Sequence, residues 1–209
     1  MPLKRKKEKR EPKKLFLIVC EGEKTEPHYF NVMVDKLKTS RRISSKSDAI
    51  VFHGKHTDPL GVLNDLINYQ KDGSKYTDFD QKWIVIDRDE RSDGKGGHPK
   101  DNFDNALKKS EAKGVEAAWS NPCFEIWFLL HFEYMDVAID RKAVTEKLKT
   151  KDKLPDYEKG AENIYNLLEP KIYDAIRNAK KLESESTSKN SNPGTTVHKL
   201  VEKLLNVAV

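Results

Sequence analysis

Three carboxylates stand at the ends of two apolar segments of this 209-residue chain, a position from which acids can bind a metal ion. Glu21 follows the run LFLIVC at 15–20. Asp87 is the last residue of the run KWIVID at 82–87, and Asp89 lies two residues beyond it. Residues i and i+2 of an extended chain point to the same side, so the two aspartates can face one point. Carboxylates crowded in a poorly solvated cleft raise each other's pKa, which a divalent cation relieves. Oxygen ligands without Cys or His favour Mg²⁺ or Mn²⁺, ions that assist phosphoryl chemistry.

The alternative interpretation of these acids is ordinary, because acids at strand ends often serve as solvated loop residues or helix caps. Their combination at one edge favours a site, since open parallel sheets bind ligands beyond the carboxyl ends of their strands. Glu21 joins the aspartates only if the first and third strands of the sheet are neighbours.

The elements that must position these acids alternate along the first two thirds of the chain. Strands are expected at 15–20, 49–53, 82–87 and 114–120, with helices over about 25–37, 58–67, 101–113 and 123–132. Alternation of this kind predicts an α/β fold with a parallel sheet of about four strands, right-handed crossovers and helices on both faces.

The remainder of the chain divides into a tail and a helical region. From 140 onward no strand is expected, and helices are predicted at 140–150, 157–183 and 195–207. The predicted organisation is a basic disordered tail at 1–14, an α/β core at 15–135 and a helical extension at 136–209 packed on the core. The tail carries a net charge of +6 and the rest −1, so it either binds phosphate backbones or only aids solubility.

Composition and motifs exclude several classes. The N-terminus lacks the apolar region of a signal peptide, and no apolar run approaches the roughly 20 residues of a membrane span, so a soluble cytoplasmic protein is expected. Cys20 and Cys123 lie in apolar blocks and are expected to be buried free thiols. The absence of a P-loop and of GxGxxG disfavours NTP hydrolysis and dinucleotide binding.

Longer strings around the acids resemble known families. IVCEG at 18–22 followed by IDRDE at 86–90 resembles the Toprim module of topoisomerases, bacterial primases and OLD-family nucleases. The chain is also similar to the RloB-like family, on four strings: EGEKTEPHYF at 21–30, IDRDE at 86–90, NPCFEIWFLLHF at 121–132 and NPGTTVHKLV at 192–201. Members of that family are small Toprim proteins linked to bacterial restriction and abortive-infection loci, some encoded beside an AAA-type ATPase.

This resemblance implies a Toprim-like fold and a Mg²⁺-dependent endonuclease that cuts DNA or RNA in antiviral defence, with an ATPase partner. Glu21 would be the general acid/base or a metal ligand, and Asp87 and Asp89 would be metal ligands. Gly22 would allow close backbone approach in the first turn. Glu125 would be an additional metal-binding acid, although an acid at a helix N-terminus is the alternative.

Other features stay open at this stage. Glu23, Lys24 and Glu26 flank the first motif at the mouth of the predicted site, and Lys24 is either a phosphate contact there or a solvated lysine. The slot of a further Toprim acid falls on Glu90 or Asp93, which leaves the number of metals open, with two favoured. A non-catalytic sensor module of a defence system is the alternative function, favoured by the near-neutral body of the chain. The helical C-terminal third is a candidate surface for a homodimer or another partner.

Overall fold

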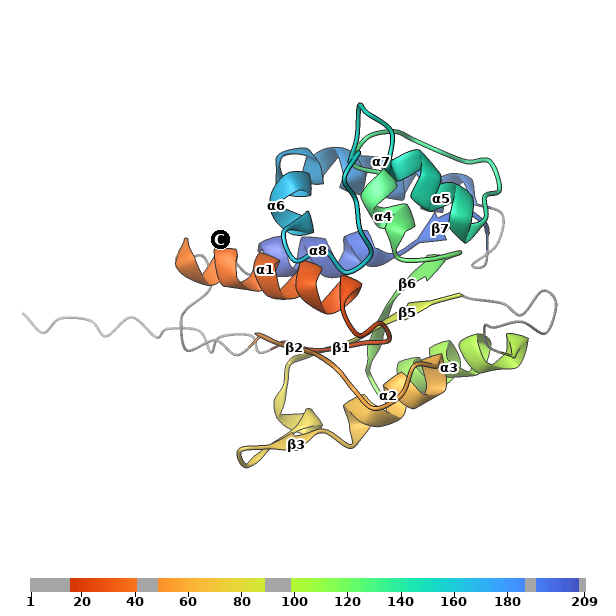
Figure 1. Cartoon of the computed structure of the whole chain (residues 1–209). Coiled ribbons are helices and arrows are strands. Elements are labelled where there is room, and N and C mark those ends of the chain that lie inside the picture. Colours follow the sequence, from red (N-terminus) through yellow and green to blue (C-terminus); the bar gives the residue numbers. More distant parts are fainter. Residues whose placement is uncertain (1–15, 41–48, 89–98, 187–190, 207–209) are drawn as a thin grey trace, which may run out of the picture.

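The computed structural model of the chain describes residues 16–40, 49–88, 99–186 and 191–206 (Figure 1). The predicted tail at 1–14, Asp89, Glu90 and Asp93 lie outside the described residues. Predictions that rest on them therefore stay predictions.

A five-stranded sheet in the order β2-β1-β5-β6-β7 forms the centre of the fold. Its strands are β1 (Phe16–Cys20), β2 (Ala49–His53), β5 (Gln81–Asp87), β6 (Glu116–Asn121) and β7 (Gly194–Thr195). The first four strands are parallel, which confirms the predicted α/β sheet. The short β7 is antiparallel to β6 and contradicts the expectation that strands stop at 140. Two residues are too few to give an alternating pattern that sequence analysis can detect.

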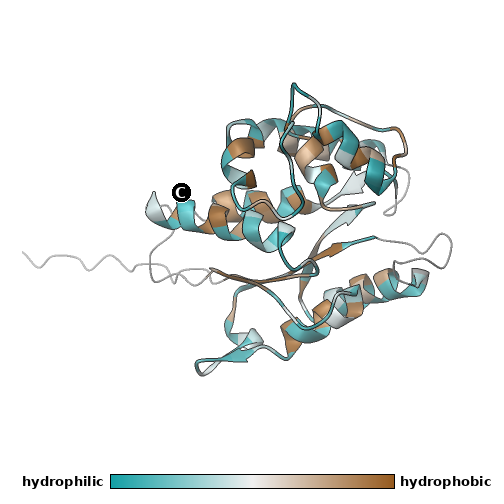
Figure 2. Ribbon diagram, in the orientation of Figure 1, coloured by the Kyte–Doolittle hydropathy of each residue, from teal (hydrophilic) through white to brown (hydrophobic). Residues whose placement is uncertain are grey.

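Helices cover both faces of the sheet. Helix α1 (Thr25–Thr39) lies on one face, while α2 (Pro59–Ile67) and α3 (Lys100–Ala112) lie on the other (Figure 1). Alternate residues of β1 belong to two separate cores: Ile18 packs with the α1 side and Val19 with the α2–α3 side. Figure 2 shows hydrophobic residues along the central strands and in the helices that cover them. Burial on both faces explains why these strands are continuous apolar runs.

The C-terminal region is helical, as predicted, but its helices differ in extent. It comprises α5 (Arg141–Leu148), α6 (Ile164–Leu168), a 3₁₀ turn (Glu169–Lys171), α7 (Ile172–Glu185) and α8 (Val197–Asn206). Before it, the helix predicted at 123–132 is the shorter α4 (Glu125–Leu129). The predicted helix at 157–183 is wrong at its start and is interrupted at Pro170, which lacks the N–H that a continuous helix needs. These helices share one hydrophobic core with α1 and the sheet.

A small hairpin between α2 and β5 was not expected from the sequence. Strands β3 (Gln70–Lys71) and β4 (Ser74–Lys75) are joined by Asp72 and Gly73, with φ of +53° and +83°. Two left-handed residues are what a two-residue hairpin turn requires, and Asp-Gly is a common sequence for it. The hairpin leads into a 3₁₀ turn (Tyr76–Asp78) before β5.

The NPGTT segment at 192–196 completes one edge of the sheet. Thr196 N–H donates to the Trp119 carbonyl at 2.9 Å, and Trp119 N–H donates to Thr196 Oγ1 at 3.0 Å. The Thr196 hydroxyl also donates to the Ala117 carbonyl at 3.1 Å. This segment therefore satisfies backbone groups at the edge of β6, which a sheet would otherwise leave unpaired.

Two remaining expectations concern the thiols and the membrane. Cys20 and Cys123 are buried free thiols, as predicted, and burial raises the pKa of both. In the described parts of the chain, no helix combines the length and the apolar composition needed to cross a membrane.

The buried His131 predicts a loss of stability in acid. Its Nδ1–H donates to the Trp127 carbonyl at 2.8 Å, and burial lowers its pKa from 6.5 to about 4. Because the unfolded chain binds this proton more readily, the free energy of unfolding should fall by up to about 3 kcal/mol from pH 6.5 toward pH 4. Denaturant unfolding of His131→Leu should lack this contribution to the pH slope. Equal slopes in the variant and the wild type would contradict the assignment.

Candidate functional site

The site lies where the direction of the sheet's connections changes. From β1 the chain crosses to β2 on one side, and from β5 it crosses to β6 on the other. The carboxyl ends of β1 and β5 therefore flank a crevice of the kind in which open α/β sheets bind ligands. The two strands are paired, so the condition that brings Glu21 to the aspartates is met. Glu21 N–H extends this pairing by donating to the Val85 carbonyl at 2.9 Å.

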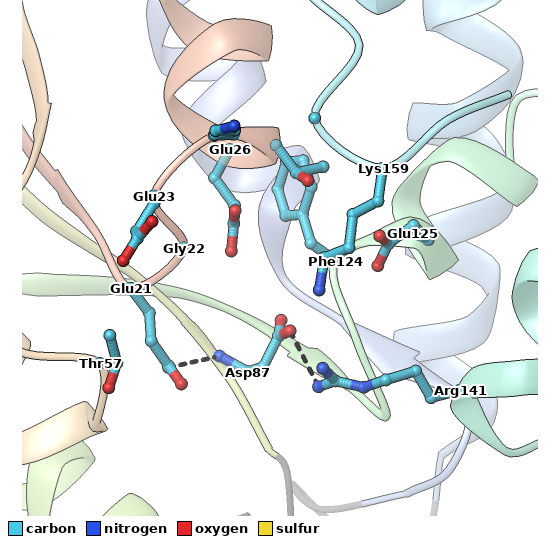
Figure 3. Close-up of a pocket in the computed structure, with 13 residues that line it drawn as sticks. Glu21, Gly22, Glu23, Glu26, Thr57, Asp87, Phe124, Glu125, Arg141 and Lys159 are labelled. Atoms are coloured by element: carbon cyan, nitrogen blue, oxygen red, sulfur yellow. Dashed lines mark hydrogen bonds and ion pairs between the residues drawn. The ribbon is translucent and has the colours of Figure 1, made fainter.

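A pocket of about 510 Å³ opens at this edge (Figure 3). The predicted site residues Glu21, Gly22, Lys24, Asp87 and Glu125 all line it. The other lining residues are Glu23, Thr25, Glu26, Thr57, Phe124, Arg141, Lys159 and Gly160. The structure thus brings together every predicted site residue that it describes, from three separate parts of the chain.

The Glu21 side chain is hydrogen-bonded to the backbone of Asp87. The Asp87 N–H donates to Glu21 Oε2 at 3.0 Å, and Arg141 Nη2 lies 3.4 Å from Asp87 Oδ2. Burial, with the neighbouring charges of Glu26 and Glu21, raises the pKa of Asp87 well above its usual range, while Arg141 opposes the shift. The ionised form of Asp87 is therefore disfavoured in this pocket, and a bound cation would stabilise it.

Glu26 is an acid of this site that sequence reasoning placed only at its mouth. It lies in the first turn of α1, is 5% exposed and points its carboxylate into the pocket (Figure 3). Burial, then the charges of Glu125 and Glu21, raises the pKa of Glu26 to about 7. The available signal was its spacing, because an acid in the first turn of the helix that follows a strand returns to the end of that strand.

Glu125 is buried at the start of α4 and faces the same pocket. Its Oε1 accepts a hydrogen bond from the Tyr157 hydroxyl at 3.0 Å. The position is compatible with both predicted roles, the pocket acid and the acid at a helix N-terminus.

Gly22 lies directly against the Glu26 carboxylate. A Cβ added at Gly22 would lie 2.0 Å from Glu26 Oε2, so alanine here must displace that carboxylate. We expect Gly22→Ala to weaken Mn²⁺ binding about tenfold, in the range seen when groups that orient metal ligands are lost. Calorimetry on Gly22→Ala, Glu26→Gln and the double variant tests the cause. The effects should be far from additive, and simple additivity would contradict the proposed clash.

The donor set of this pocket fits a hard divalent cation, since all its acids offer carboxylate oxygens. Burial, with the charges of neighbouring carboxylates, raises the pKa of Glu26 and of Asp87, so a bound cation would stabilise the ionised form of both. Among the described residues, however, no three His, Cys, Asp or Glu side chains are already arranged around a common ion position. To bind an ion, the Asp87 side chain would have to rotate away from Arg141, or the Glu21 side chain away from the Asp87 N–H.

The fold and the site together define an α/β protein with an acidic pocket at the switch point of a parallel sheet. The chain belongs to the RloB-like protein family, whose model matches residues 16–204, from β1 into α8. No curated protein and no solved structure matches the chain. The match to this family model confirms the resemblance to the RloB-like family that the sequence suggested.

Proposed function

We propose that this protein is a metal-dependent endonuclease of the Toprim type, which hydrolyses phosphodiester bonds of DNA or RNA in bacterial antiviral defence. The observation that carries the proposal is the gathering of buried acids at the switch point, with the pKa of Glu26 and of Asp87 raised. Perturbed carboxylates in a cleft are a mark of functional sites. Burying an ionised carboxylate costs free energy, so acids that had no function here would only lower the stability of the fold.

The charge of the pocket supports Mg²⁺ or Mn²⁺ as the cofactor. Five carboxylates and three basic side chains line it, so with all groups ionised its formal charge is −2, which one divalent cation cancels. We propose Glu21, Asp87 and Glu125 as ligands together with Asp89. Oxygen donors of this kind leave Mg²⁺ positions for water and phosphate oxygens.

A bound Mg²⁺ would lower the pKa of water and stabilise the charge on the phosphate. In the hydrolysis, the water oxygen forms a bond to phosphorus, the bond from phosphorus to the leaving sugar oxygen breaks, and that oxygen gains a proton. We assign the proton released by water to Glu26, a buried carboxylate that faces the pocket and whose pKa is raised by burial in the metal-free protein. Glu21, the acid/base group implied by the family resemblance, is the second candidate for this role.

The proposed partners follow from the family resemblance and the charge distribution. Nucleic acid is the proposed substrate, and the basic tail at 1–14 would add affinity by counterion release. An AAA-type ATPase is the proposed activating partner and the cytoplasm is the proposed location. The helical C-terminal third is a candidate surface either for this partner or for a homodimer.

Incubation with plasmid DNA, tRNA and single-stranded DNA tests this function. Each substrate is combined with the full chain in Mg²⁺, in Mn²⁺ and in EDTA, with Asp87→Asn as the variant. We expect cutting that needs the metal and is lost in the variant. Calorimetric titration with Mn²⁺ accompanies the assay. Equal Mn²⁺ binding by the wild type and Asp87→Asn would refute the site.

A non-catalytic sensor module is the second candidate. The near-neutral body of the chain favours it, because nucleases that act alone usually present a basic groove. Mn²⁺ binding that depends on Asp87, without cleavage of any substrate when the ATPase partner is supplied, would favour the sensor over the nuclease.

A further inference from the structure

Two basic side chains from the C-terminal region enter the acidic pocket. Arg141 is the first residue of α5, and Lys159 lies in the segment between α5 and α6. Both line the pocket, and Figure 3 shows their cationic ends directed toward its acids. Neither is explained by metal binding, because a cation repels a metal ion.

The fold holds Lys159 in place by anchors on both sides. We call residues 157–160 the strap. The Tyr157 hydroxyl donates to Glu125 Oε1 at 3.0 Å, and His28 Nδ1–H donates to the Gly160 carbonyl at 2.8 Å. One anchor belongs to the start of α4 and the other to α1, so the strap lies across the pocket between two helices that themselves carry site acids. Lys159 is therefore positioned by the fold.

Lys159 has capacity for an anion, and Arg141 presents its guanidinium to the same pocket. Lys159 takes part in no ion pair among the described residues. Arg141 approaches Asp87 at 3.4 Å, longer than a strong charge-assisted hydrogen bond, and its Nη2 also lies 3.3 Å from the Pro122 carbonyl. A guanidinium can bind two phosphate oxygens at once, and an ammonium adds a mobile point charge.

We propose that Lys159 and Arg141 form a phosphate-binding subsite that holds the nucleic-acid backbone against the acidic pocket. This inference rests on the proposed function and assigns the substrate contact to the C-terminal region. A phosphodiester approaching several carboxylates meets like charge, and fixed cations beside them offset that repulsion. The same cations can stabilise the additional negative charge on phosphorus during hydrolysis.

The competing explanation is that both residues only neutralise acids. The charge of Lys159 offsets part of the burial-raised pKa of Glu26, and the charge of Arg141 offsets part of the burial-raised pKa of Asp87. A neutralising cation affects metal affinity and pH dependence. A phosphate contact also contributes to the salt dependence of nucleic-acid binding, because it releases condensed counterions.

Binding of a fluorescein-labelled single-stranded oligonucleotide in Ca²⁺, measured by anisotropy over a range of salt concentrations, separates the two explanations. We expect Lys159→Met to weaken binding about tenfold and to reduce the slope of log K against log salt by about 0.7. Arg141→Gln should change the slope in the same direction. Lys113→Met is the matched control, because Lys113 is an exposed lysine at the end of α3, on the opposite face of the sheet.

The strap itself is tested with Tyr157→Phe, which removes one anchor and no charge. We expect weaker oligonucleotide binding with an unchanged salt slope, because Lys159 keeps its charge but loses its fixed position. Mn²⁺ affinity of Lys159→Met, measured by calorimetry, should equal or exceed that of the wild type.

Failure of this inference and failure of the nuclease proposal are distinguishable. Wild-type affinity and slope in Lys159→Met would overturn the subsite even if the protein cuts DNA or RNA. The absence of oligonucleotide binding by the wild type would overturn it as well. If oligonucleotide binding depends on Lys159 but the protein cuts none of the substrates, the subsite is supported and the nuclease proposal is contradicted.

Discussion

Asp87→Asn is expected to lower metal-dependent cleavage at least about a hundredfold, since removal of even a supporting group around a bound metal costs 10–100-fold. Asp87 ends β5 beside Glu21, and its carboxylate lies between the acids of the pocket and Arg141 (Figure 3). Asparagine keeps the backbone N–H that donates to Glu21 and nearly the same side-chain shape. The loss would therefore report the missing charge rather than a collapsed site.

The same substitution is expected to stabilise the metal-free protein. The pKa of Asp87 is raised in the folded state, so the folded chain binds this proton more tightly than the unfolded chain does. The stability that protonation supplies is present at acid pH and is lost as the pH rises through the raised pKa. Asparagine cannot ionise, so in EDTA at neutral pH its melting temperature should match or exceed that of the wild type.

Asp80→Asn is the control for Asp87→Asn, because Asp80 is exposed and precedes β5 at the opposite end of the strand. It should cleave, bind Mn²⁺ and melt like the wild type. Cleavage retained by Asp87→Asn would show that the pocket is not the catalytic centre. A large drop in its melting temperature would show instead that Asp87 serves the fold as an anion.

The parallel sheet was predictable because its strands are buried on both faces and therefore appear as continuous apolar runs. Glu21 and Asp87 were predictable for the same reason, since each stands at the end of such a run. The short β7 and the β3–β4 hairpin lack such a pattern, because two residues cannot show one. The interrupted helix at Pro170 was missed because apolar residues continue across the break.

The basic half of the pocket was not predictable. Arg141 meets Asp87 across 54 residues of sequence, and Tyr157 meets Glu125 across 32, through helix packing that no local pattern encodes. Lys159 stands in a segment of mixed charge, where a lysine resembles any solvated lysine. Glu26 was underrated because the residues that line the pocket around it include Lys159 and Gly160, which are far from it in the sequence.

Glu26→Gln is expected to remove a pH dependence from the metal-free protein. The pKa of Glu26 is raised from 4.5 to about 7, so the folded state loses stability as the pH rises across this interval. A shift of this size corresponds to at most about 3 kcal/mol, shared with the acids that surround Glu26. Denaturant unfolding in EDTA should show this decline in the wild type and a flatter curve in the glutamine variant.

Metal binding should show the opposite pH trend, because a cation favours the ionised carboxylate that the apo fold penalises. Between pH 5.5 and 7.5, Mn²⁺ affinity of the wild type should rise as Glu26 loses its proton. Glu26→Gln should bind Mn²⁺ 10–100-fold more weakly at pH 7.5, which is about the effect that supporting groups have on metal affinity. Its Mn²⁺ affinity should also rise less with pH than that of the wild type. Asp35→Asn, an exposed acid on the same helix, should retain both wild-type profiles.

These two trends are linked by one cause, the crowding of anions around Glu26. If glutamine flattens the stability curve but leaves Mn²⁺ binding and its pH dependence intact, the ion lies away from Glu26 and the proposed base must be another acid. If neither curve changes, the carboxylate is not confined among the acids of the pocket. A gain in apo stability together with a loss of metal affinity is the result that only a cation-dependent acidic site produces, because a structural carboxylate would lose stability when neutralised.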